Sequence, residues 1–178
     1  MIDYVERGKN IKLLRRSQGI SVEKASLDAP LSETRWKQLE AGQRNINTTF
    51  DTMQRIAHVL NVELLVLEVF SRSDEEIRAM VSAFPKAPQQ STADIHPGSN
   101  ILWLRDYQKM TQKRLAADSD MSTARLRDIE HCTANPTIKY LERIANALGV
   151  SLFTLYALTV PEQAILDMVH AARKLVTV

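Results

Sequence analysis

Arginine and glutamate recur in this chain at one fixed spacing. Arg15 and Glu40 lie 25 positions apart, and Arg105 and Glu130 repeat that spacing 90 positions later. Each pair encloses a pattern typical of a helix-turn-helix, LLRRSQGIS…LSETRWKQLEAG in the first half and LRDYQKMTQKRLAADSDMSTARLRDIE in the second. A helix-turn-helix places one helix in the major groove of DNA. The chemistry that this pattern predicts is hydrogen bonding to DNA, at two places on one chain.

No set of side chains in the sequence is spaced for catalysis or metal binding. There is no glycine-rich phosphate loop, and no Cys–His or Ser–His arrangement with a supporting acid. The 4 histidines are scattered without the spacing of zinc ligands. We therefore expect no enzyme activity, no metal and no cofactor.

The elements that must position these residues are helices. Apolar residues fall at helical spacing almost throughout, and strand-like alternation is scarce. Ser21 and Ser32 in the first half, and Thr111 and Ser122 in the second, stand where N-caps of the two motif helices are expected. The sequence predicts an all-α protein.

The repeat extends well beyond the two motifs. Its offset falls from 90 to 88 and is then held, so that Ile56 matches Ile144, and DEEIRAMVSAF matches PEQAILDMVHAA. A register held so far indicates duplication of a whole domain that ends in an amphipathic helix. We therefore predict a first, divergent domain with its terminal helix over 1–84, a linker rich in Pro, Ser and Gln over 85–99, and a second domain with its terminal helix over 100–178.

Composition is that of a soluble globular protein. Hydrophobic residues make up 44% of the chain and charged residues 25%, and the net charge of +2 is only a weak sign of a polyanionic partner. The single cysteine, Cys132, rules out an intramolecular disulfide and fits a reducing compartment. No apolar run approaches the roughly 20 residues of a membrane helix. We expect a cytoplasmic protein that has no membrane partner.

The second half resembles the lambda-repressor and Cro type of DNA-binding domain, also called Xre-type, from Ile101 to Leu155. The landmarks of the resemblance are TQKRLA, MSTARLRDIE, NPT and LERIANALGVSL, in that order. The first half resembles the same family more loosely, from Ile11 to about Leu67. The resemblance implies two tandem five-helix domains, in which helices two and three form the motif and the start of helix three faces the bases.

In the second copy the resemblance implies a set of DNA contacts. These are Gln112, Lys113, Ser122, Thr123, Ala124, Arg125, Arg127, Asp128, His131 and Asn135. Arg127 has the geometry to bind guanine O6 and N7, and Ala124 to touch a thymine methyl. Gln112 matches a position that binds backbone phosphate, and His131 and Asn135 match further phosphate positions.

The corresponding residues differ in the first copy. They are Ser32, Glu33, Thr34, Arg35, Lys37, Gln38, Gln43, Arg44 and Asn45. Val22 stands where the second copy has Gln112, so that phosphate contact is lost. Glu33 either accepts from cytosine N4 or repels phosphate. The two copies therefore read different half-sites, or one copy has weakened and serves another purpose.

The resemblance also implies two structural ion pairs, which join helices one and three of each copy. They are Arg15–Glu40 and Arg105–Glu130. Removing one partner would strand a charge, so these pairs should act on stability. Trp36 and Leu126, the apolar residues of each third helix, are expected in the cores.

The resulting hypothesis is a sequence-specific regulator of transcription that binds double-stranded DNA, and a repressor that occupies an operator overlapping a promoter. One chain supplies both reading heads, or two chains supply four. The apolar terminal segment ILDMVHAARKLV favours a homodimer, although it could equally cover the core of its own domain. The alternative is a protein-binding regulator, such as an antitoxin or anti-activator, in which one copy binds a partner protein. Val22 and Glu33 in the first copy keep this alternative open.

Overall fold

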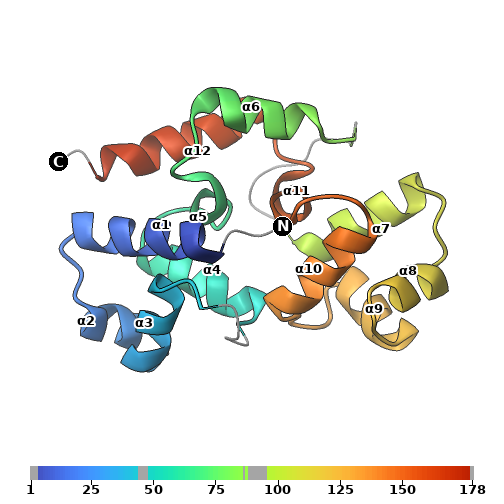
Figure 1. The fold of residues 1–178 in the computed structure, drawn as a ribbon, viewed down its shortest axis with the longest axis horizontal. Coiled ribbons are helices and arrows are strands. Elements are labelled where there is room, and N and C mark those ends of the chain that lie inside the picture. Colours follow the sequence, from blue (N-terminus) through green and yellow to red (C-terminus); the bar gives the residue numbers. More distant parts are fainter. Residues whose placement is uncertain (1–3, 44–47, 86, 88–95, 177–178) are drawn as a thin grey trace. The chain divides into compact units, whose positions relative to one another are not determined.

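The computed structural model describes residues 4–43, 48–85, 87 and 96–176, and every element in these ranges is a helix (Figure 1). The first half contains α1 Tyr4–Ser17, α2 Val22–Asp28, α3 Glu33–Glu40, α4 Phe50–Val59, α5 Val66–Val69 and α6 Asp74–Ser82. The second half contains α7 Pro97–Tyr107, α8 Gln112–Asp118, α9 Thr123–Glu130, α10 Ile138–Ala147, α11 Leu152–Ala157 and α12 Glu162–Lys174. The expected all-α class is confirmed.

Packing divides the chain into two units. The N-terminal unit contains the described residues within 4–78 and 162–176, and the central unit contains the described residues within 79–161. The division falls within α6, and α12 packs in the N-terminal unit although its sequence belongs to the second repeat. The packing units and the sequence blocks 1–84 and 100–178 therefore differ at the terminal helices.

In the N-terminal unit, α1 packs on α3 and α5, and α2 packs on α3. The core is built from the apolar faces of these helices and of α4, including Ile11, Leu14 and the fully buried Trp36. Helix α12 covers α5 with a buried apolar stripe that consists of Ile165, Leu166, Val169 and Ala172. This spacing places the four residues on one face of the helix, and that face packs against the rest of the unit.

Polar contacts also hold α12 in place. The Asp74 carboxylate at the start of α6 accepts from Arg173 at 2.6 Å and contacts Nε2 of His170 at 2.7 Å. Arg78 lies 3.8 Å from Glu162, so the start of α6 faces the end of α12 and the two helices run antiparallel. The hydrogen bonds from Arg173 and then His170 lower the pKa of Asp74 below its ordinary value.

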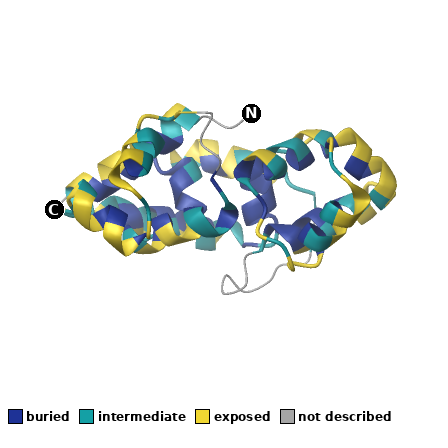
Figure 2. Ribbon diagram, turned by 90° about the horizontal axis from the view of Figure 1, so that it is seen from below, coloured by how far each residue is buried: buried dark blue, intermediate teal, exposed yellow. Residues whose placement is uncertain are grey.

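In the central unit, α7 packs on α9, α10 and α11, and α8 packs on α9 and α10. Its core includes Ile101, Leu104, Leu126 and Ile144, all fully buried. Figure 2 shows buried residues on the inward sides of the helices and exposed residues on their outward sides. Helix α7 begins at Pro97, inside the predicted linker 85–99, because His96 caps it and proline is well tolerated in the first turn.

The two halves share a set of buried hydrogen bonds. Nδ2 of Asn10 donates to the carbonyl of Leu67 at 3.0 Å, and Nδ2 of Asn100 donates to the carbonyl of Leu155 at 2.8 Å. Likewise, Gln18 donates to the carbonyl of Leu60, and Gln108 to the carbonyl of Leu148, both at 2.7 Å. These partners follow the sequence offsets of 90 and 88, so the duplicated residues make duplicated contacts.

A close approach of helices is repeated as well. An added Cβ at Gly8 in α1 would lie 2.6 Å from the carbonyl oxygen of Leu39, and one at Gly98 in α7 would lie 2.1 Å from the carbonyl oxygen of Ile129. Both distances are too short for any side chain. Glycine therefore lets each first helix touch the end of each third helix.

Candidate nucleic-acid interface

The central unit contains a compact helix-turn-helix formed by α8 and α9. The Thr111 hydroxyl accepts from the Arg114 amide at 3.2 Å to cap α8, and the Ser122 hydroxyl accepts from the Arg125 amide at 3.1 Å to cap α9. The turn between them passes through Asp120, whose φ of +52° lies in the left-handed region. Both predicted N-caps are confirmed, and together with this turn they set where α9 begins.

One face of α9 is fixed in the core. Leu126, Ile129 and the Glu130 side chain are buried, whereas Thr123, Ala124 and Arg127 are exposed. The spacing between the exposed residues is that of one helical face. The helix therefore presents two small residues at its start and an arginine one turn later.

The Glu130 side chain accepts hydrogen bonds from two other helices. Nε of Arg105 in α7 donates to its carboxylate at 2.6 Å, and Nε2 of Gln112 in α8 donates to the same carboxylate at 2.7 Å. Nη1 of Arg105 also donates to the carbonyl of Met110 at 3.1 Å. The hydrogen bond to Glu130 raises the pKa of Arg105 above its ordinary value. This network holds α7, α8 and α9 in one fixed arrangement.

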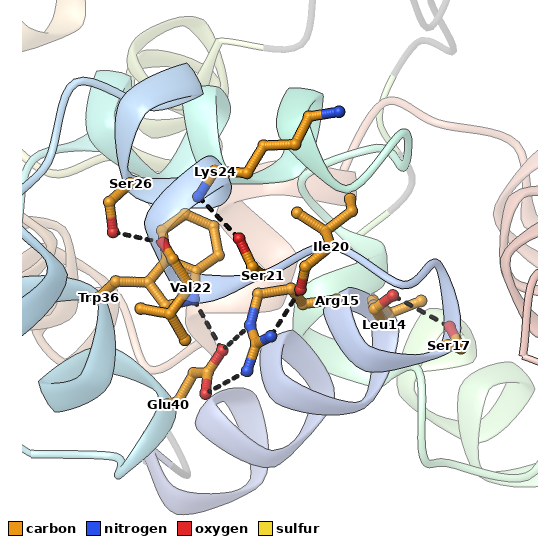
Figure 3. A network of polar contacts seen from close by, with 10 residues as sticks. All are labelled: Leu14, Arg15, Ser17, Ile20, Ser21, Val22, Lys24, Ser26, Trp36 and Glu40. Atoms are coloured by element: carbon orange, nitrogen blue, oxygen red, sulfur yellow. Dashed lines mark hydrogen bonds and ion pairs between the residues drawn. The ribbon is translucent and has the colours of Figure 1, made fainter.

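The first half builds an equivalent network from a different third donor (Figure 3). Nε of Arg15 donates to Glu40 at 2.6 Å, and Nη1 of Arg15 donates to the carbonyl of Ile20 at 2.7 Å. Here Nε1 of Trp36, in the same helix as Glu40, donates to the carboxylate at 2.7 Å. Val22 takes the place of the glutamine and has no polar atom to offer. Both expected ion pairs are thus present, and both are nearly buried.

Most of the predicted interface residues lie on exposed or partly exposed surface. Exposed residues are Ser32, Glu33, Thr34, Lys37, Gln43, Lys113, Ser122, Thr123, Ala124, Arg127, His131 and Asn135, and partly exposed residues are Arg35, Gln38, Gln112, Arg125 and Asp128. Ser32, like Ser122, caps its helix through its hydroxyl. Arg44 and Asn45 lie outside the described residues.

Charges on the third helices are arranged differently in the two halves. On α3, Nζ of Lys37 lies 2.9 Å from the carboxylate of Glu33, so the exposed lysine is paired within its own helix. On α9, Arg127 and Asp128 are 4.0 Å apart. Arg127 is therefore held less tightly by its acidic neighbour than Lys37 is.

Helices α2 and α8 also differ in charge. Helix α8, with sequence QKRLAAD, carries two basic residues and one acidic residue, whereas α2, with sequence VEKASLD, carries one basic and two acidic residues. Lys113 in the first turn of α8 corresponds to Glu23 in α2. A polyanion is attracted more strongly to the first turn of α8.

The sequence did not predict a group of two arginines around one tyrosine ring beside α9. The guanidinium carbons of Arg125 and Arg143 lie 5.6 Å and 5.8 Å from the ring centre of Tyr140. Tyr140 and Arg143 are three residues apart on α10, a spacing visible in the sequence. Nothing in the sequence, however, shows that Arg125 from α9 reaches the same ring.

Possible metal ligands, the cysteine and the lengths of the helices in the described ranges also bear on function. Their histidine, cysteine and acidic side chains form no group of three or more that is placed to hold a metal ion. Cys132 is a free, exposed thiol with a φ of +59°, at the position of Gly42 in the first half. No helix formed by these residues combines the length and the apolar run that a membrane span requires.

Comparison with known proteins agrees with this geometry. Residues 101–155 match the family model described as Helix-turn-helix, and they form a helix-turn-helix domain. The chain is also 38% identical, over 55 residues, to the immunity repressor protein of Bacillus phage phi105. The matched segment is 31% of this chain and spans 38% of that repressor. No solved structure gives a significant match.

Proposed function

We propose that this protein is a cytoplasmic, sequence-specific regulator of transcription that binds double-stranded DNA and acts as a repressor. The observation that carries the proposal is the orientation of α9. One side of this helix, with Leu126 and Glu130, is buried. The opposite side, with Thr123 and Ala124 at the capped start and Arg127 one turn later, is exposed. Small and forked polar side chains on an exposed helix are suited to base edges in the major groove.

Further support comes from the surroundings of α9. The turn with Asp120 and the Glu130 network hold α8 against α9, and α8 brings Lys113 and Arg114. The matched relative is named an immunity repressor, which is consistent with repression by occupation of an operator. The proposed DNA contacts in this unit are those expected from the sequence, with Arg127 as the principal base reader.

The same proposal assigns a second reading head to the first half, in tandem with the first. The shared asparagine and glutamine hydrogen bonds and the shared Arg–Glu pair support a common fold for α1–α5 and α7–α11. The Lys37–Glu33 pair and the acidic α2 make this head the weaker of the two. We propose that the protein acts as a homodimer, which sedimentation at micromolar concentration would test.

The test of DNA reading is selection of bound fragments from random duplexes, followed by footprinting. Arg127→Ala should cost about 1–3 kcal/mol on the selected site and relax one base position. Lys37→Ala should cost less and act on a different part of the footprint. Retention of full affinity and full base preference by Arg127→Ala would show that α9 does not read the bases as proposed.

A second candidate function is that the first half binds a partner protein, as in an antitoxin or anti-activator. Leu27 on α2 is 73% exposed, and it stands where α8 has Ala117. Together with Glu23, it gives α2 a surface suited to a protein rather than to phosphate. If α2 grips a protein, Leu27→Asp will leave the footprint intact and abolish regulation in cells. If the first half reads DNA, Leu27→Asp will leave regulation intact, and Lys37→Ala will shorten the footprint.

A further inference from the structure

The ring of Tyr140 lies close to two arginines that come from different helices of the central unit. Arg125 is supplied by α9 and Arg143 by α10, and both guanidinium groups lie within 6 Å of the ring centre, at 5.6 Å and 5.8 Å. At such distances the negative face of an aromatic ring attracts a cation. One ring therefore contacts two positive side chains that come from different helices.

The charge of this cluster is only partly balanced. Arg143 lies 3.1 Å from the carboxylate of Asp120 and donates to the Asp120 carbonyl at 3.2 Å. The Asp120 side chain is 87% exposed, so water competes for its carboxylate and the pair is weak. Among the described residues, no carboxylate lies within ion-pair distance of Arg125. An excess of positive charge remains beside the first turn of α9.

We propose that Arg125, Arg143 and Tyr140 form a binding site for a phosphate of the DNA backbone, next to the base-reading face. Tyr140 is the positioning residue, because its ring orients both guanidinium groups. The phosphate replaces the Asp120 carboxylate as the partner of Arg143, which exchanges one solvated ion pair for another with two arginine donors. This inference rests on the proposed function, since it requires DNA to lie along α9.

The first half lacks the parts of this site. The repeat places Thr52 where Tyr140 stands, and Pro30 where Asp120 stands. Arg55, the counterpart of Arg143, is paired with Asp51 on its own helix. The site is therefore a property of the central unit, and it adds sequence-independent affinity to the stronger of the two reading heads.

The test uses the full chain and a duplex selected by the wild-type protein, with Kd measured over a range of KCl concentrations. Arg143→Gln should reduce the slope of log Kd against log salt by about one, which is about 5–10-fold weaker binding at 0.1 M KCl. Preference among duplexes should be unchanged, because a phosphate contact carries no base information. Asp120→Asn should have the opposite effect, with tighter binding and a steeper slope.

Tyr140 provides the matched pair of variants. Tyr140→Phe retains the ring and should bind as the wild type does, whereas Tyr140→Leu should weaken binding and reduce the slope. Thermal unfolding of each variant separates these effects from misfolding. If the wild type discriminates between duplexes but Arg143→Gln and Tyr140→Leu leave the slope unchanged, this site is refuted and the proposed function stands. If the wild type shows no salt-sensitive binding to any duplex, both are refuted.

Discussion

The first half and the central unit keep the same buried ion pair but complete it from different helices. Glu130 receives its additional hydrogen bond from Gln112 in α8, whereas Glu40 receives it from Trp36 in its own helix. A carboxylate that is largely shielded from water needs hydrogen-bond donors, but the position of these donors in the sequence is not constrained. Because Trp36 supplies a donor, Val22 can stand where Gln112 stands.

A second difference concerns the contact between the first and fifth helices. In the N-terminal unit, Arg7 in α1 lies 2.7 Å from Glu68 in α5, with 6% and 9% of their side chains exposed. The repeat replaces these residues with Pro97 and the buried Tyr156 in the central unit. The N-terminal unit therefore has a nearly buried charge pair at positions where the central unit has a proline and a tyrosine, neither of which carries a charge.

The largest effect is expected from breaking the shared ion pairs. Arg105→Ala should destabilise the central unit by about 3–5 kcal/mol, because it leaves Glu130 charged and fully buried. Arg15→Ala should have a similar effect on the N-terminal unit. The measurement is hydrogen exchange at increasing urea, resolved by peptide so that the two units are followed separately.

The matched control is Arg125→Ala, which removes an arginine from the same unit without stranding a buried carboxylate. It should change stability by far less than Arg105→Ala does. Equal and small effects of all three substitutions would show that the buried pairs are not essential to the scaffold.

The next effect comes from filling the helix contacts at the two glycines. Gly98→Ala places a Cβ 2.1 Å from the Ile129 carbonyl, and Gly8→Ala places one 2.6 Å from the Leu39 carbonyl. Overpacking of this kind costs about 1–3 kcal/mol, and the shorter distance should give the larger effect. Gly19→Ala is the spatial control, since nothing lies within 4 Å of its added Cβ, although its φ of +65° adds local strain. Thermal unfolding ranks the three variants, and an order with Gly8→Ala below Gly98→Ala in stability would contradict the contact geometry.

Removing the hydrogen bond that Gln112 donates to Glu130 should have a smaller effect on the stability of the central unit. Gln112→Met retains the side-chain length and deletes the bond to Glu130, at an expected cost of about 1–2 kcal/mol. In the N-terminal unit, Val22→Gln should bring little gain, because Trp36 already donates to Glu40. Urea unfolding resolved by unit distinguishes these outcomes. A gain from Val22→Gln as large as the loss from Gln112→Met would mean that the tryptophan does not substitute for the glutamine.

The smallest expected effect is a dependence of the stability of the central unit on pH, through His96. Nδ1 of His96 accepts from the Gly98 amide at 3.1 Å, and burial lowers the pKa of His96 below the ordinary value of 6.5. As pH falls below about 6.5, the unfolded chain takes up the proton first, so the stability of the central unit declines until the folded pKa is reached. The loss should be about 1 kcal/mol, the size of a helix cap. His96→Asn keeps a cap and should remove this decline between pH 7 and pH 5, as measured by hydrogen exchange in the central unit; an unchanged decline would place its origin elsewhere.

Local signals in the sequence predicted much of the fold and part of the candidate site. Ser21, Ser32, Thr111 and Ser122 were expected as N-caps, and each hydroxyl accepts from the amide three residues later. Such contacts depend on neighbours in the chain, so residue type and spacing are enough to predict them. The family resemblance implied the exposed start of α9, and the burial of Leu126 and Ile129 on the opposite side agrees with it.

Contacts between distant segments were not predictable in this way. The amphipathic pattern of α12 shows that one face must be covered, but not that α5 of the first half covers it. The family resemblance implied a phosphate contact for Gln112, whereas its bond to Glu130 became visible only when α8 and α9 were packed together. The Arg125–Tyr140 contact has the same origin.

The sequence by itself determined the helices, their caps and the repeated spacing of the Arg–Glu pairs. It could do so because these properties depend on periodicity and on neighbours a few residues away. Tertiary structure alone decided which unit holds α12, which donor completes each buried carboxylate, and which arginines share the ring of Tyr140. These depend on geometry between segments tens of residues apart, where several side chains could satisfy the same burial or hydrogen bond and only the packed chain selects one.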